Sequence, residues 1–176
     1  KEAAQICYEA GSSVSQDHQN YMAEEVAKLV STDMKGNAVT DDIGAINTEA
    51  MKQTLGIAQQ YVTLDDSAAQ EVFAALTIDD FCDSSYYDAA KASDGTFDVE
   101  QPEVSIQLKW LPDAQFMGYY VAQAKGYYDE VGLTVNIVSG GGDISETTAV
   151  NNGTFDFGVT WPTNMAVADA GGMDLI

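Results

Sequence analysis

The feature that most constrains this fold is an alternation of strand and helix patterns between Val104 and Ile176. Apolar residues alternate with polar ones from Val104 to Lys109, as in a strand. The expected elements that follow are a helix over 114–131 ended by Gly132, a strand over 133–138, a helix over 144–152 capped by Asp143, a strand over 155–160, a helix begun by Pro162, and a strand from 174. Such alternation implies right-handed crossovers, so the predicted fold class is α/β with a mostly parallel sheet.

The first ninety residues have helical periodicity instead. Gly11 ends a first predicted helix, Ser15 caps a second, and Asn47 caps a third after a polar loop from Ser31 to Gly44. A shorter helix is expected over 68–76. The α/β part is therefore preceded by a helical segment, residues 1–90.

Between these parts, residues 91–103 are small, polar and acidic and follow neither period. That composition is typical of a linker, so we place a segment boundary there and treat 104–176 as a separate α/β part.

The charge balance limits the partners. The 28 acidic residues outnumber the seven basic ones, and the formal net charge is −21. Nucleic acid is excluded as a partner, because binding it requires a basic surface. Every basic residue is Lys, so no guanidinium is present to hold a carboxylate or phosphate ligand. A neutral or weakly polar ligand fits better.

Metal, cofactor and catalytic chemistry have no support in the motifs. Cys7 and Cys82 lack metal-ligand spacing and are read as buried thiols, with a disulfide between them as the open alternative. His18 has no nucleophile at motif spacing, and the aspartates around Phe81 do not form a calcium loop. We expect no metal, no cofactor and no catalytic residue.

No apolar run is long enough to span a membrane. Lys1 opens directly into a helical pattern and Ile176 falls at the start of a predicted strand, so both ends are read as cuts.

A glycine turn, Gly140–Gly142, connects a predicted strand to a predicted helix. The backbone at Gly141, together with Asp143, can line a cleft at the carboxyl ends of parallel strands, where ligands bind in open α/β sheets. A tight structural turn is the alternative. The phosphate-loop and dinucleotide motifs are absent, which excludes nucleotide binding.

Aromatic and amide side chains cluster in the same predicted region. Trp110 and Trp161 each follow a predicted strand directly, where indoles can stack on a flat heterocycle; ordinary core packing is the alternative. Gln115 and Tyr119 share one helix face near Trp110 and can hydrogen-bond a ring amide.

The α/β part also resembles a known family. The run from Gln107 to Ala122, QLKWLPDAQFMGYYVA, followed by KGYYDEVGL, GGDI and DFGVTW, closely resembles the thiamine-synthesis-like branch of solute-binding proteins of ABC importers. The resemblance implies a type II periplasmic-binding-protein lobe. It also implies that Trp110, Gln115, Tyr119 and Trp161 lie in or near a ligand cleft, with the glycine turn nearby.

The resemblance implies a function as well. It implies capture of a thiamine pyrimidine precursor or a riboflavin-like flavin, delivery to a membrane permease, and an extracytoplasmic location with an anchor elsewhere in the chain. The cysteine-rich motif and substrate histidine of the related pyrimidine-forming enzymes are not seen. An enzyme is thus the weakest reading, and a sensor or structural surface protein that reuses the fold is the alternative.

Residues 1–90 resemble the C-terminal end of the same family, through the LTIDDF and YYDAA segments. The tail therefore precedes the head. Tandem copies joined by the linker, a circular permutation and pieces of a longer chain are three explanations, of which tandem copies, and thus a neighbouring copy of the domain, are favoured.

Overall fold

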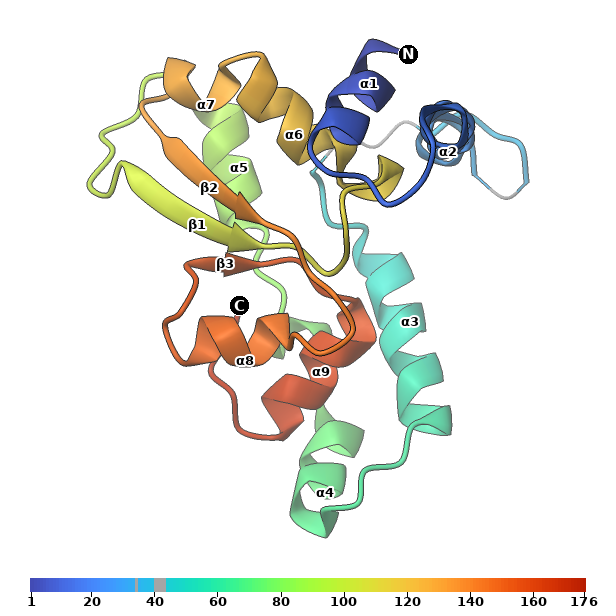
Figure 1. The fold of residues 1–176 in the computed structure, drawn as a ribbon. Coiled ribbons are helices and arrows are strands. Elements are labelled where there is room, and N and C mark those ends of the chain that lie inside the picture. Colours follow the sequence, from blue (N-terminus) through green and yellow to red (C-terminus); the bar gives the residue numbers. More distant parts are fainter. Residues whose placement is uncertain (34, 40–43) are drawn as a thin grey trace. The chain divides into compact units, whose positions relative to one another are not determined.

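The protein is described from a computed structural model covering residues 1–33, 35–39 and 44–176 (Figure 1). Residues 34 and 40–43 of the predicted loop lie outside the described residues. The described elements are α1 (Glu2–Glu9), α2 (Gln16–Ser31), α3 (Thr48–Tyr61), α4 (Ser67–Ala75), the 3₁₀ turn η1 (Ile78–Asp80), α5 (Ser85–Ala92), β1 (Glu103–Gln107), the 3₁₀ turn η2 (Ala114–Phe116), α6 (Met117–Ala124), α7 (Tyr127–Glu130), β2 (Thr134–Val138), α8 (Glu146–Asn151), β3 (Phe157–Gly158) and α9 (Pro162–Ala170).

The chain forms two compact units. The first consists of Lys1–Thr40 and Thr96–Ile144, and the second of Asp41–Gly95 and Ser145–Ile176. Each unit therefore combines residues from both sides of the predicted linker.

Two parallel strands form the centre of the first unit. β1 pairs with β2 in register from Glu103 opposite Thr134 to Gln107 opposite Val138. The crossover between them runs through η2, α6 and α7, and both helices contact β2. This βαβ arrangement confirms the predicted α/β class with a parallel sheet. The helices α1–α4 correspond to the four predicted ahead of it, and α5 is a helix that the sequence pattern did not predict.

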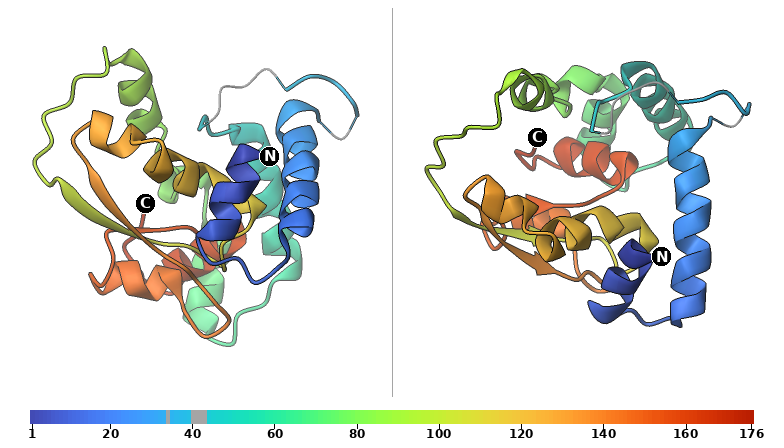
Figure 2. Two further views of the ribbon diagram at one scale, coloured as in Figure 1. Left: turned by 45° about the horizontal axis from the view of Figure 1, so that its top comes forward. Right: turned by 90° about the horizontal axis from the view of Figure 1, so that it is seen from above.

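The first two helices complete this unit. α1 packs against α2 and α6, and Figure 2 shows α1 beside α6 in both views. Ala4 and Cys7 on the inner face of α1 are buried. At the exposed end of the contact, Lys125, the residue after α6, forms an ion pair with Glu2.

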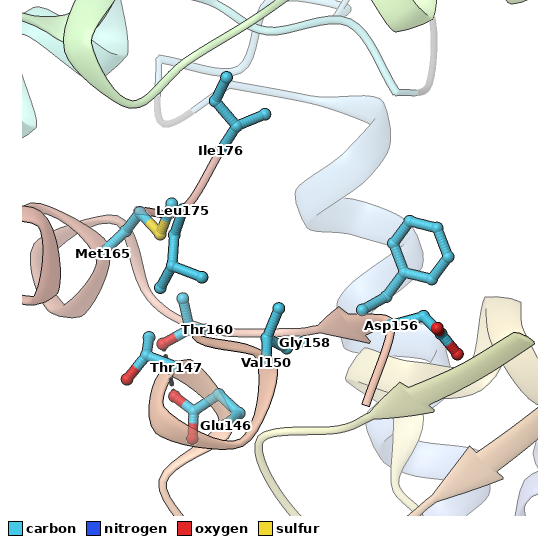
Figure 3. Close-up of a pocket in the computed structure, with 10 residues that line it drawn as sticks. Glu146, Thr147, Val150, Asp156, Gly158, Thr160, Met165, Leu175 and Ile176 are labelled. Atoms are coloured by element: carbon cyan, nitrogen blue, oxygen red, sulfur yellow. Dashed lines mark hydrogen bonds between the residues drawn. The ribbon is translucent and has the colours of Figure 1, made fainter. Parts of the chain in front are cut away.

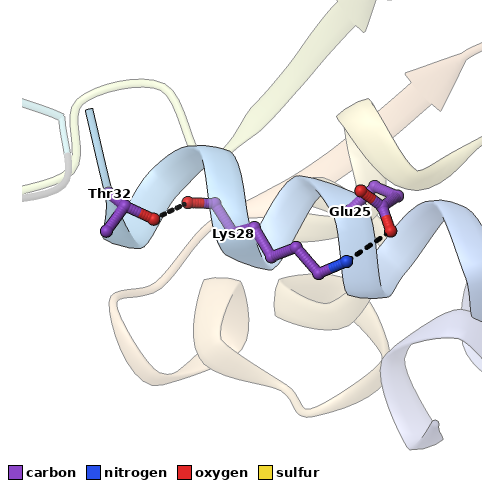
Figure 4. A network of polar contacts seen from close by, with 3 residues as sticks. All are labelled: Glu25, Lys28 and Thr32. Carbon is purple, nitrogen blue, oxygen red and sulfur yellow. Dashed lines mark hydrogen bonds and ion pairs between the residues drawn. The ribbon is translucent and has the colours of Figure 1, made fainter. Parts of the chain in front are cut away.

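The ends of α2 follow from local side chains. Ser15 Oγ accepts a hydrogen bond from His18 N at 3.3 Å, which confirms the predicted N-cap. The last turn is closed by the Thr32 hydroxyl, which donates to the Lys28 carbonyl at 2.7 Å, and Lys28 pairs with Glu25 (Figure 4).

The apolar residues in the last turn of α2 remain exposed: Leu29 is 73% and Val30 is 59% accessible.

The second unit has an all-helical core. α9 packs against α3, α4 and α8. The buried residues of this core are Leu55, Ala58, Phe73, Ile78, Phe81, Ala166 and Ala170. Asn47 Oδ1 accepts from Ala50 N at 3.0 Å, which confirms the predicted cap of α3.

Four predicted elements differ in detail. The strand expected over 155–160 is reduced to Phe157–Gly158. The helix expected over 114–131 is divided, because Gly126 adopts a left-handed conformation (φ +77°) between α6 and α7. α8 is capped by Ser145 rather than Asp143, since Ile144 N donates to Gly141 O at 3.2 Å and the helix starts after that turn. At 174–176 the described chain forms no strand, and Asp174 N instead donates to Asn151 Oδ1 at 3.3 Å.

Candidate functional site

The turns that follow β1 and β2 are held against each other. Gly140 N donates to Trp110 O at 3.0 Å, two residues beyond the last bond between the strands, from Leu108 N to Val138 O at 2.8 Å. A Cβ atom at Gly140 would lie 2.2 Å from the Leu108 carbonyl oxygen and 2.4 Å from the Lys109 carbonyl carbon. Only glycine permits this approach, so Gly140 is required to bring the two turns together.

Gln107 also links the two strand ends, through hydrogen bonds from its buried side chain. Its side chain is 1% exposed, and its Nε2 lies 3.0 Å from Ser139 O and 3.2 Å from Leu108 O. Gln107 takes a polar position in the alternating pattern of β1, yet its side chain is enclosed. Its burial is possible because strand ends in parallel sheets are covered on both faces and because backbone carbonyls accept from the amide.

Five of the six predicted ligand residues lie in this first unit. Trp110 is 47% exposed in the turn after β1, and Gly141 and Asp143 lie in the turn after β2. The structure thus brings Trp110 to the glycine turn, as the strand order predicts. Gly141 itself has open space around a hypothetical Cβ, so its backbone does not need glycine there.

Gln115 and Tyr119 come from successive elements, η2 and α6, rather than from one helix. The Gln115 amide donates to Asp113 Oδ2 at 3.0 Å, and Asp113 also caps η2 through Gln115 N at 3.1 Å. Tyr119 is half-buried, and burial raises the pKa of its hydroxyl, which therefore stays protonated as a hydrogen-bond donor at neutral pH.

A buried thiol lies behind this turn. Cys7 of α1 is fully buried, and burial, with a smaller contribution from the Asp113 carboxylate, raises its pKa to about 11. Cys7 is therefore protonated at neutral pH and inert, as expected for a buried thiol. Both cysteines are free thiols.

Trp161 belongs to the second unit and directly precedes α9. Its carbonyl accepts from Met165 N at 3.0 Å in the first turn of that helix, while its side chain is 45% exposed. Pro162 occupies the first helical position, which confirms the predicted start.

A small cavity lies between β3, α8 and α9 (Figure 3). Its lining includes Thr160, the residue before Trp161. Its volume is about 70 Å³, which is room for about two waters and well below the roughly 300 Å³ of a small-ligand pocket. Glu146, only 2% exposed, accepts a hydrogen bond from the Thr160 hydroxyl at its wall. Sequence reasoning missed this buried carboxylate because a Glu in a first helical turn is usually on the surface.

Within the part of the chain that the structure describes, no group of three or more His, Cys, Asp or Glu side chains is placed to hold a metal ion. None of its helices combines the length and apolar character needed to cross a bilayer.

Comparison with known proteins agrees with the resemblance over much of the α/β part. The sequence model of the family described as NMT1/THI5 like matches residues 113–176. No curated protein and no solved structure matches the chain. The matched region begins at Asp113 and contains Gln115, Tyr119, Gly141, Asp143 and Trp161. It is similar to a thiamine-pyrimidine-related binding-protein family, and the remainder of the chain is outside the match.

Proposed function

We propose that this chain is part of an extracytoplasmic solute-binding protein that captures a flat heterocyclic vitamin or vitamin precursor for an ABC importer. The observation that carries the proposal is the contact from Gly140 N to Trp110 O. It joins the turn that carries the half-exposed Trp110 to the glycine turn, beyond the carboxyl ends of two parallel strands, and ligands bind at such ends in open α/β sheets. The family match over 113–176 supports the same reading.

The residues favour a stacked, largely neutral ligand. Trp110 offers a half-exposed ring face, and Gln115 and Tyr119 offer polar groups that suit a ring amide. The absence of Arg disfavours a ligand recognised through a carboxylate or phosphate. A thiamine pyrimidine precursor or a riboflavin-like flavin meets these requirements.

Trp161, which belongs to the second unit, stays a proposed ligand residue in its own right. The bound ligand is then delivered to a membrane permease. Lobe closure over the ligand would be a hinge motion stabilised by burying the ring. The tail-like character of residues 1–90 supports the further proposal that the full chain carries a neighbouring copy of the domain, with an anchor outside this segment.

Binding is tested by isothermal calorimetry with riboflavin and with hydroxymethylpyrimidine, alongside tryptophan fluorescence of the unmodified chain. We expect saturable binding that quenches the indole emission. Trp110→Ala and Trp161→Ala should each weaken binding about tenfold, the equivalent of roughly 1.4 kcal/mol lost from stacking. Tyr61→Ala is the matched control, because Tyr61 is an aromatic side chain that is 75% exposed on α3.

The alternatives give different results. Absence of binding to any vitamin, together with ordered self-association, would replace transport with a sensor or structural role. Turnover of a pyrimidine precursor would replace it with catalysis. Equal losses in Tyr61→Ala and the two tryptophan variants would remove the assigned site.

A further inference from the structure

We propose that Gln19 of α2 is a positioning residue for the ligand turn, which we define as residues 110–115. Its effect on ligand affinity rests on the proposed function, whereas the contact between Gln19 and the turn does not. It gives the N-terminal helices a role in ligand binding, although Gln19 lies 93 residues from the turn in the sequence.

The geometry of Gln19 carries the argument. Its side chain is 0% exposed, and its Nε2 donates to Pro112 O at 3.1 Å and to Ser12 Oγ at 2.6 Å. Pro112 is buried as well. A buried carbonyl without a donor costs about 1–3 kcal/mol, so the Gln19 amide fixes the orientation of the Pro112 peptide.

The ligand turn is thus held by two successive anchors on different elements. The Trp110 carbonyl accepts from Gly140 N in the turn after β2, and the Pro112 carbonyl accepts from Gln19 in α2. α1 and α2 both contact η2 directly, so the support continues to Gln115. Without the Gln19 anchor, the hydrogen bond from Gly140 N would be the one of these two anchors left to orient the turn at Trp110.

A purely structural role is the competing explanation, because α2 has little else buried: Gln19 is the one residue of this helix that is fully enclosed among the described residues. In that case Gln19 would fasten α2 to the unit without affecting Trp110. A readout confined to Trp110 separates the two explanations.

The spectroscopic arm uses the full chain in a Trp161→Phe background, so that Trp110 is the sole tryptophan. Gln19→Met keeps the size of the side chain and removes its donor. The matched control is Gln123→Met in the same unit, which removes an amide donating to Val135 O at 2.9 Å, between α6 and β2. We expect Gln19→Met to shift the Trp110 emission and to change its acrylamide quenching constant about twofold, and Gln123→Met to change neither.

Ser12→Ala is a milder second variant, in case Gln19→Met does not fold. It removes the other acceptor of the Gln19 amide, and we expect a smaller change of Trp110 emission in the same direction. A change of melting temperature without any change at Trp110 in either variant would overturn the inference in favour of a structural role.

The binding arm measures riboflavin and hydroxymethylpyrimidine affinity by calorimetry with both tryptophans present. We expect Gln19→Met to weaken binding about three- to tenfold, with Gln123→Met unchanged. If the Trp110 signature changes but the unmodified chain binds neither compound, positioning stands and the proposed function fails. If the unmodified chain binds and the two Met variants behave alike, the function stands and positioning fails.

Discussion

At the scale of single residues, Gly140 is the position where the fold has least freedom. Its missing side chain lets the turn after β2 reach the Trp110 carbonyl. Gly140→Ala would place a methyl carbon closer to the Leu108 carbonyl oxygen than van der Waals contact allows. A backbone oxygen cannot move aside as a flexible side chain can. We expect the free energy of unfolding to fall by about 2–3 kcal/mol or more, measured by urea denaturation.

Gly142→Ala provides the control for that prediction, because nothing lies within 4 Å of a Cβ built at Gly142. It should change stability by less than about 1 kcal/mol, given that Gly→Ala at a compatible position is near neutral or stabilising. Equal losses in the two variants would show that Gly140 is not sterically constrained.

The two thiols should differ in reactivity for a physical reason. Cys7 is fully buried with its pKa raised to about 11, whereas Cys82 is less buried and the pKa of its thiol is raised by burial and by Asp79. With Ellman's reagent at pH 8, the Cys82→Ala variant, which keeps Cys7, should react at least tenfold more slowly than Cys7→Ala, which keeps Cys82. Both should react rapidly in denaturant, and equal rates under native conditions would contradict the burial of Cys7.

The candidate site shows which residues a sequence can identify. Trp110 and the glycine turn could be predicted together because both follow strands, and parallel strands end at the same edge. Gln107 and Gln19 could not be predicted, because their importance comes from buried carbonyls at 138–139 and at Pro112 that lie far away in sequence. A polar side chain gives no local signal that distinguishes a buried amide from a solvated one.

At the scale of elements, short-range signals predicted the helix starts. Ser15, Asn47 and Pro162 each act within one turn of their own position, and each was confirmed. One error arose where two signals competed. Asp143 and Ser145 are both good caps, and the turn closed by Ile144 N and Gly141 O decides between them.

The last turn of α9 contains an acidic residue that we expect to oppose stability. Burial, with the nearby Asp80 and Asp174 carboxylates, raises the pKa of Asp169 above its ordinary value of 3.8. The native state then binds more protons than the unfolded state just above pH 3.8, so this group lowers stability as pH rises through the folded pKa. The negative charge also lies at the unfavourable end of the helix dipole.

Asp169→Asn should therefore raise the free energy of unfolding at pH 7 by about 0.5 kcal/mol and change it little at pH 3, measured by urea denaturation. Asp65→Asn is the control, since it removes the same charge from an exposed loop of the same unit. A gain of equal size at both pH values, or in both variants, would show that the surroundings of Asp169 are not responsible.

At the scale of the molecule, the two compact units do not follow the order of the chain. α1 packs against α6 in the first unit, and α3 and α4 pack against α9 in the second. Each of these contacts joins residues before position 95 to residues after it. Composition alone suggests a linker at 91–103, but composition cannot reveal that helices on either side of it share a core.

This arrangement predicts the result of cutting the chain. A specific protease site inserted between Gly95 and Thr96 lies in an exposed segment, and Gly95 has open space around it. After cleavage, fragments 1–95 and 96–176 should elute together in gel filtration and keep the circular dichroism of the uncut insertion variant. The reason is that either fragment alone would expose its half of both cores, including Phe73 and Leu55 on one side and Ala166 on the other.

The same experiment measures how the halves depend on each other. Urea should separate the fragments as the cores that they share unfold, whereas independent domains joined by a linker would separate without denaturant and keep their own secondary structure. Co-elution would mean that each compact unit needs both the tail-like and the head-like segment. Helix α2, which carries Gln19, would then fold together with the ligand turn. Gln19 can position the turn only under that condition.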